Sequence, residues 1–102
     1  MNEKLRDYVA EFMAIVGYLR GREGAILRDG CLLVKKNVLM KHFDRNRYDT
    51  ATNKLAVWRA LQWIDCDRER FTRRLKVNGE QITVVKIRLS VWEVLQQLTK
   101  TE

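Results

Sequence analysis

The 102-residue chain contains no proline. Because proline interrupts helices and central strands, its absence favours regular elements joined by short connections and argues against a proline-rich linker. Histidine occurs once and cysteine twice, and the wide spacing of Cys31 and Cys66 fits no metal site or redox motif. We therefore expect two small buried cysteines rather than a disulfide, and no metal or other cofactor.

Long apolar runs are also missing. The most apolar N-terminal stretch, residues 5–19, is interrupted by Arg6, Asp7 and Glu11, which excludes a signal peptide and a membrane span of roughly 20 apolar residues. No glycine-rich phosphate loop, nucleophile motif or zinc-ligand spacing is present. We accordingly predict a single cytoplasmic domain over residues 1–102 that does not engage a membrane and is not an enzyme.

Acidic residues are outnumbered: 20 Lys and Arg stand against 13 Asp and Glu, a formal net charge of +7. Such a balance favours polyanionic partners. Most of the excess lies between Arg68 and Arg88, where seven bases accompany only Glu69 and Glu80. Within this stretch, two β-rich runs flank Asn78-Gly79, which is the strongest short-range indication of a hairpin.

Apolar periodicity and capping residues predict the remaining elements. In chain order we expect a helix over 3–20, short strands over 25–28 and 31–34 around Asp29-Gly30, helices over 36–44 and from about 50 to 63, strands over 70–77 and 81–89, and a helix over 91–98 capped by Ser90. Trp58 falls on the inner side of its helix, which indicates a core anchor rather than a platform for base stacking.

The turn of the basic hairpin determines which side chains share a face. The apolar residues form two sets, Phe71, Leu75 and Val77 in the first strand and Val85, Ile87 and Leu89 in the second. A two-residue turn would put these sets on opposite faces, so we expect a three-residue loop with Gly79 in the left-handed region. The bases Arg74, Lys76, Lys86 and Arg88 would then all point away from the core.

This order of elements, with a basic hairpin after a pair of helices, resembles the winged helix-turn-helix superfamily over residues 3–98. The segment from Tyr48 to Asp67 is similar to recognition helices that run into a wing. The resemblance implies an α+β fold with a three-helix core, a basic β-hairpin wing and a C-terminal helix. It also implies a protein that binds double-stranded DNA, as a transcriptional regulator or a mobile-element accessory factor.

The same resemblance implies a set of DNA-contacting residues. Asn53 would read adenine and Arg59 guanine, which are the pairings that base-edge geometry favours. Phosphate contacts would come from the turn and the wing. The implied residues are Arg45, Arg47 and Tyr48 at the turn, Thr52, Asn53, Lys54 and Arg59 on the outward side of the second helix of the pair, and Arg73, Arg74, Lys76, Lys86 and Arg88 in the wing.

Two other interpretations remain open. The basic hairpin is also compatible with a solvated sheet face. Alternatively, the chain is a protein–protein interaction domain of a larger replication or regulatory complex, because Val57, Trp63 and Trp92 fall beside the predicted apolar stripes. We also expect a homodimer through the first and last helices, which is compatible with DNA binding and with protein–protein interaction. RNA binding is disfavoured, since no paired aromatics mark a sheet face.

Overall fold

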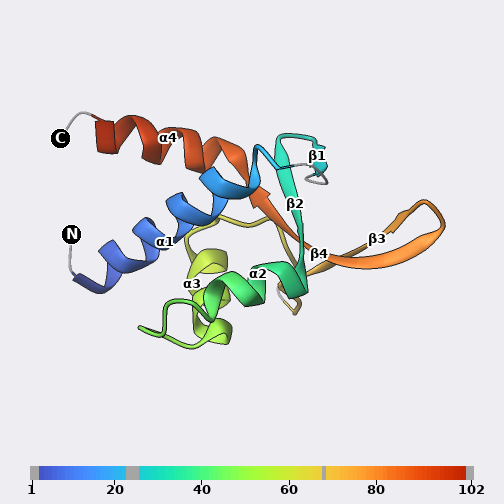
Figure 1. Ribbon diagram of the computed structural model, residues 1–102, viewed down its shortest axis with the longest axis horizontal. Helices are drawn as coiled ribbons and strands as arrows, with labels where there is room; N and C mark the ends of the chain where they lie inside the picture. Colours follow the sequence, from blue (N-terminus) through green and yellow to red (C-terminus); the bar gives the residue numbers. More distant parts are fainter. Residues whose placement is uncertain (1–2, 23–25, 68, 101–102) are drawn as a thin grey trace.

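The computed structural model describes residues 3–22, 26–67 and 69–100, so Ala25 and Arg68, which belong to predicted segments, lie outside the described residues. The protein has an α+β fold (Figure 1). Its elements are α1 (Glu3–Leu19), β1 (Ile26–Arg28), β2 (Cys31–Lys35), α2 (Lys36–Phe43), α3 (Ala51–Ala60), β3 (Arg73–Val77), β4 (Glu80–Arg88) and α4 (Leu89–Lys100). None of the helices in the described ranges is long and apolar enough to cross a membrane.

The four strands form one antiparallel sheet in the order β1-β2-β4-β3. β2 ends at Lys35, opposite Val84, whereas β4 and β3 remain paired outward to Val77 and Glu80. The outer part of the β3–β4 hairpin therefore projects beyond the body of the molecule, as Figure 1 shows. This projection contributes to the elongated shape, with extents of 45 × 26 × 25 Å.

The turn of this hairpin is shorter than predicted. Val77 pairs with Glu80, which leaves only Asn78 and Gly79 in the loop, with φ angles of 52° and 83°. Two consecutive positive φ angles are those of a type I′ turn, whose twist matches that of the strands. The expectation of a three-residue loop was wrong, because pairing with β2 as well as β3 determines the register of β4.

The shorter turn distributes the apolar residues over both faces of the sheet. Val85 and Ile87 join the main core under the helices, whereas Leu75 packs against a smaller cluster around Val84 on the other face. The four bases expected to point the same way are divided too. Arg74 and Lys76 lie on the side of Val85, and Lys86 and Arg88 lie on the side of Val84.

The main core is built from the helices around Trp58, as predicted. Trp58 makes edge contacts with Phe12 and Phe43, each at a ring-centroid distance of 5.0 Å. Trp63 and Trp92 are also buried, although the sequence placed them beside the apolar stripes. The indole N–H of Trp92 donates to the Met13 carbonyl at 3.3 Å, which joins α4 to α1.

The end of α3 explains the burial of Trp63. The helix ends at Ala60, three residues earlier than predicted. Beyond it, the Gln62 amide donates to the Arg59 carbonyl and the Trp63 amide to the Trp58 carbonyl, at 3.0 and 2.8 Å. With Gln62 at φ 60°, this is a Schellman motif, and it turns Trp63 into the core. At the other junction α4 begins directly at Leu89, so Ser90 lies within the helix rather than capping it.

Candidate nucleic-acid interface

Lys54 lies in the interior of the protein, not on the outward side of α3 as predicted. Its side chain is 0% exposed, and its ammonium donates to Glu11 Oε2 at 3.0 Å and to the carbonyl oxygens of Phe43 and Asn46. A buried charge requires such partners, because desolvation would otherwise cost several kcal/mol. Lys54 therefore joins α1 to the α2–α3 connection and is not available to a nucleic acid.

Tyr48 belongs to the same buried network. Its hydroxyl donates to Glu11 Oε1 at 2.7 Å, and burial together with this hydrogen bond raises the pKa of Tyr48 far above its ordinary value. Nearby, the Tyr8 hydroxyl donates to Asp49 Oδ2, which raises the pKa of Tyr8 to about 12. The connection between α2 and α3 is thus held to α1 by two tyrosines, and the Tyr48 hydroxyl is already engaged.

The outward surface of α3 offers little for base recognition. The Thr50 hydroxyl caps the helix by accepting from the Asn53 amide at 3.1 Å. The Asn53 side chain donates to Asp49 Oδ1 at 3.1 Å, and the Arg59 guanidinium lies 4.5 Å from the centre of the Phe71 ring. Thr52 is exposed. Asn53 and Arg59, the two residues expected to read bases, are therefore both held by neighbouring side chains.

On the side of the sheet that carries Val84, the wing bases are partly neutralised. An isolated bridge pairs Ile64 with Ile87, so Asp65 lies beside Lys86 on this face. Asp65 contacts Lys86 at 3.3 Å, Arg73 at 3.5 Å and Arg88 at 3.9 Å. Partial burial alone would raise the pKa of Asp65, but the hydrogen bond from Lys86 and the three cations hold it below its ordinary value. We call this side the reverse face of the wing.

The opposite side, the helix-side face of the wing, carries Arg74, Lys76, Gln81 and Thr83. Cross-strand pairing places Arg74 beside Thr83 and Lys76 beside Gln81, on the same side of the sheet as Val85. Arg74 and Lys76 are exposed, and neither forms an ion pair with another described residue. Of the five predicted wing contacts, only these two bases lie free of carboxylates on a common face.

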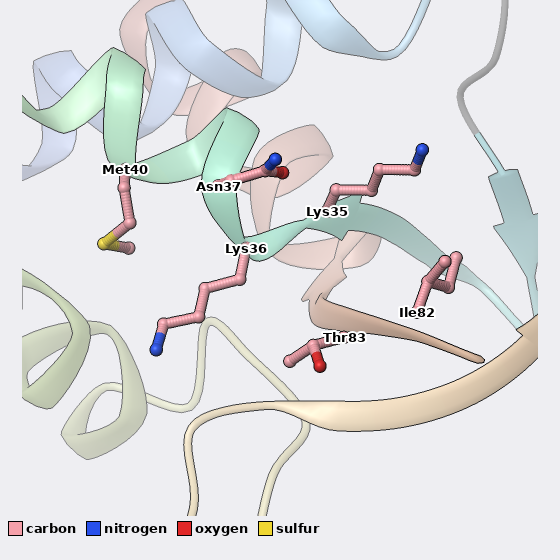
Figure 2. A pocket seen from close by; sticks show the side chains of 6 residues that line it. All are labelled: Lys35, Lys36, Asn37, Met40, Ile82 and Thr83. Carbon is pink, nitrogen blue, oxygen red and sulfur yellow. The ribbon is translucent and has the colours of Figure 1, made fainter. Parts of the chain in front are cut away.

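An open cleft of about 530 Å³ separates the wing from the start of α2 (Figure 2). Its lining consists of Lys35, Lys36, Asn37, Met40, Ile82 and Thr83, with no acidic residue among them. Sequence reasoning assigned none of these residues to a site. The adjacent lysines Lys35 and Lys36 were the one indication of this site in the sequence. Their position relative to the wing depends on the sheet register, which the sequence pattern does not give.

The connection between α2 and α3 adds two bases. Arg45 and Arg47 are both exposed, in agreement with their predicted placement at the turn. Arg47 lines a shallow hollow with Asp44 and Asp49, so acidic groups surround it. Arg45 lies near His42, whose pKa is lowered first by burial and then by the Arg45 charge. Arg45 is therefore the better placed of the two for a phosphate.

Comparison with known proteins yields no family assignment. No protein-family model matches the chain, and no curated protein matches it in sequence. Within the described ranges, no group of three or more His, Cys, Asp or Glu side chains is arranged to hold a metal ion. The distinguishing feature of the described surface is the acid-free helix-side face of the wing, next to the cleft.

Proposed function

We propose that the chain is a winged-helix domain that binds duplex DNA, mainly through the phosphate backbone. The observation that carries this proposal is the position of the β3–β4 hairpin. It follows the α2–α3 pair, its second strand pairs with the strand that precedes α2, and it projects with Arg74 and Lys76 on an acid-free face. This arrangement of strands and helices supports the winged-helix interpretation.

The mechanism is electrostatic capture. Arg74 and Lys76 on the wing and Arg45 on the connection, all exposed, supply cations to phosphates. Each phosphate neutralised releases counterions, so about three contacts give a log–log salt slope of roughly −2.7 for duplex DNA. A duplex contact of this kind positions the protein without selecting sequence. The roles that fit it are an accessory DNA-binding factor of a mobile element or a regulator with broad sequence tolerance.

The test is fluorescence anisotropy of a labelled random-sequence duplex at several salt concentrations. We expect submicromolar affinity at low salt that weakens steeply as salt is added. Replacing Arg74 and Lys76 together by Ala should abolish most of the binding. The matched control replaces Arg6 and Lys100 by Ala. These exposed bases belong to the first turns of α1 and the last turn of α4, and those ends of the two helices point away from the wing (Figure 1). An equal loss in both double variants would refute the wing as the binding element.

A second candidate function is protein–protein interaction, which one observation favours. Val94 and Leu98, four residues apart on α4, are 58% and 59% exposed. Side chains four apart lie on one face of a helix, so α4 presents a small apolar strip. Of the three residues that suggested this interpretation from the sequence, Trp63 and Trp92 are buried within the chain and Val57 is partly buried. Light scattering without DNA distinguishes this function from DNA binding. A stable oligomer that dissociates when Val94→Asp and Leu98→Asp are combined would support a protein–protein interaction domain.

A further inference from the structure

The cleft between α2 and the wing arises from the way β2 leaves the sheet. The last pair between β2 and β4 is Lys35 with Val84, and the chain then enters α2 at Lys36. Beyond that point, Ile82 and Thr83 have β3 on one side and no strand on the other. The cleft occupies this unpaired side, so the first turns of α2 form one wall and the edge of β4 the other.

The lining of the cleft has the composition of an anion site. Figure 2 shows the Lys36 side chain extending away from α2 and the Lys35 side chain leaving β2 in the opposite direction, with Thr83 on the facing strand. Asn37 and Thr83 supply an amide and a hydroxyl, both able to donate to a phosphate oxygen. Met40 and Ile82 add apolar surface. The Lys36 ammonium, two neutral donors and this apolar surface suit a phosphodiester with its attached sugar, whereas the Lys35 ammonium points away from Lys36.

The cleft is continuous with the two free bases of the wing. Thr83 pairs across the hairpin with Arg74, and Lys76 follows two residues further out on the same face. A nucleic-acid strand that touches Arg74 and Lys76 and continues towards the body of the protein therefore meets Thr83 next, and then Lys36 across the cleft. Cations from both walls, α2 and the wing, would neutralise successive phosphates of one strand.

We infer that this cleft holds the phosphodiester backbone of one strand of the bound DNA, with Lys36, Asn37 and Thr83 as binding residues. This inference rests on the proposed function and adds to it the path of the strand. Binding is centred between α2 and the wing rather than on α3. On α3, Lys54 is buried and Asn53 is hydrogen-bonded to Asp49, so that helix contributes few groups.

The test compares two lysines of the same helix. Lys36→Glu reverses a charge inside the cleft, and Lys41→Glu makes the same change at another exposed position of α2, outside the cleft lining. We expect Lys36→Glu to weaken duplex binding by about tenfold or more and to reduce the salt slope by about one unit, since one phosphate contact is lost. Lys41→Glu should weaken binding by no more than about threefold, because Lys41 does not line the cleft and its exposed charge acts only through solvent that contains screening salt.

An uncharged variant separates hydrogen bonding from net charge. Thr83→Val keeps the size and strand preference of the side chain and removes only its hydroxyl, so we expect a loss of about threefold to tenfold in affinity with an unchanged fold. Far-UV circular dichroism and thermal unfolding of each variant establish that the fold is retained. If Thr83→Val and Lys36→Glu bind the duplex as tightly as Lys41→Glu does, the cleft is not the binding site. Duplex binding by the wild-type protein would in that case still support the proposed function of the wing.

A single-stranded oligonucleotide of the same sequence, titrated in parallel, separates the two proposals further. Binding of the single strand but not of the duplex, with loss in Lys36→Glu, would overturn the duplex function and retain a nucleic-acid strand in the cleft. Inorganic phosphate at matched ionic strength provides the last probe. Saturable shifts of the Asn37 and Thr83 amide NMR signals with phosphate, but with neither oligonucleotide, would identify a small-anion site and overturn the inference. Binding of none of the three probes overturns both proposals.

Discussion

The Lys54 ammonium lies 3.0 Å from Glu11 Oε2, and both side chains are buried. This ion pair connects α3 to α1 across 43 residues of sequence. The remaining donors of the ammonium satisfy the carbonyls of Phe43 and Asn46, which belong to the end of α2 and the connection that follows. A single side chain thus fixes the relative position of three helices, which is the frame from which the wing projects.

Lys54→Met should therefore be strongly destabilising. The variant leaves the Glu11 carboxylate buried without its cation, and breaking a buried pair in this way costs about 3–5 kcal/mol. Urea unfolding monitored by tryptophan fluorescence measures the change. Lys41→Met, an exposed substitution on α2, is the control and should change the free energy of unfolding by less than about 0.5 kcal/mol. A loss below about 1 kcal/mol in Lys54→Met would show that the pair is not a structural anchor.

The hydrogen bond from Tyr8 to Asp49 should make stability depend on pH in the acidic range. This hydrogen bond is the main reason why the pKa of Asp49 lies below 3.8, the ordinary value for an aspartate. The unfolded chain therefore takes up the proton first on acidification. The stabilisation is complete above the unfolded pKa and is lost as pH falls through the folded pKa.

Tyr8→Phe tests this relationship because it removes only the hydroxyl. The free energy of unfolding of the variant should lie below that of the wild-type protein at pH 7, and the difference should shrink as the pH falls below 3.8. Tyr18→Phe, at a half-exposed position of α1, should show no such convergence. A difference between Tyr8→Phe and wild type that stays constant down to pH 2 would contradict the assignment.

Gln62 occupies a backbone conformation that favours glycine. Its φ of 60° lies in the left-handed region, at the C′ position of the Schellman motif after α3. Non-glycine residues lose roughly 1 kcal/mol in this conformation, so Gln62→Gly should raise the free energy of unfolding by about 0.5–1 kcal/mol. Gln62→Ala keeps the Cβ atom and should not stabilise the protein. A destabilised Gln62→Gly variant, measured in the same urea titration, would contradict this account.

Local chemistry explains which features the sequence predicted correctly. The buried stripe of α1 and the tight Asp29-Gly30 turn depend on residues within one or two turns of each other. Short-range spacing and turn preferences are sufficient for such features. The core position of Trp58 follows from the same helical periodicity.

The features that sequence reasoning missed depend on distant partners. The resemblance placed Lys54 on the outward side of α3. Lysine is rarely buried, and Glu11 on another helix makes the burial of Lys54 favourable. The division of the wing bases over two faces depends on the register of β4 against β2. The neutralisation of Lys86 requires Asp65, which the bridge between Ile64 and Ile87 brings alongside. None of these relationships is encoded in a local pattern.

The two faces of the wing allow a test of the proposed DNA contact within one hairpin. Arg74→Ala with Lys76→Ala and Lys86→Ala with Arg88→Ala remove the same charge, from the helix-side face and the reverse face. We expect the first double variant to lose about 30-fold in duplex affinity at 0.15 M salt, because two phosphate contacts of about 1 kcal/mol each disappear. The second should lose only about twofold, since its bases point away from the cleft and already share Asp65.

Salt dependence distinguishes lost contacts from a lowered net charge. Only the variant of the helix-side face should flatten the log–log slope, by about two units, because counterion release counts phosphates that are actually contacted. A long-range effect of net charge would instead weaken both variants equally at low salt and neither at high salt. If the two double variants instead lose the same affinity as each other at every salt concentration, and their slopes flatten equally, the wing binds through both faces. Asp65 would then not protect the reverse face from DNA.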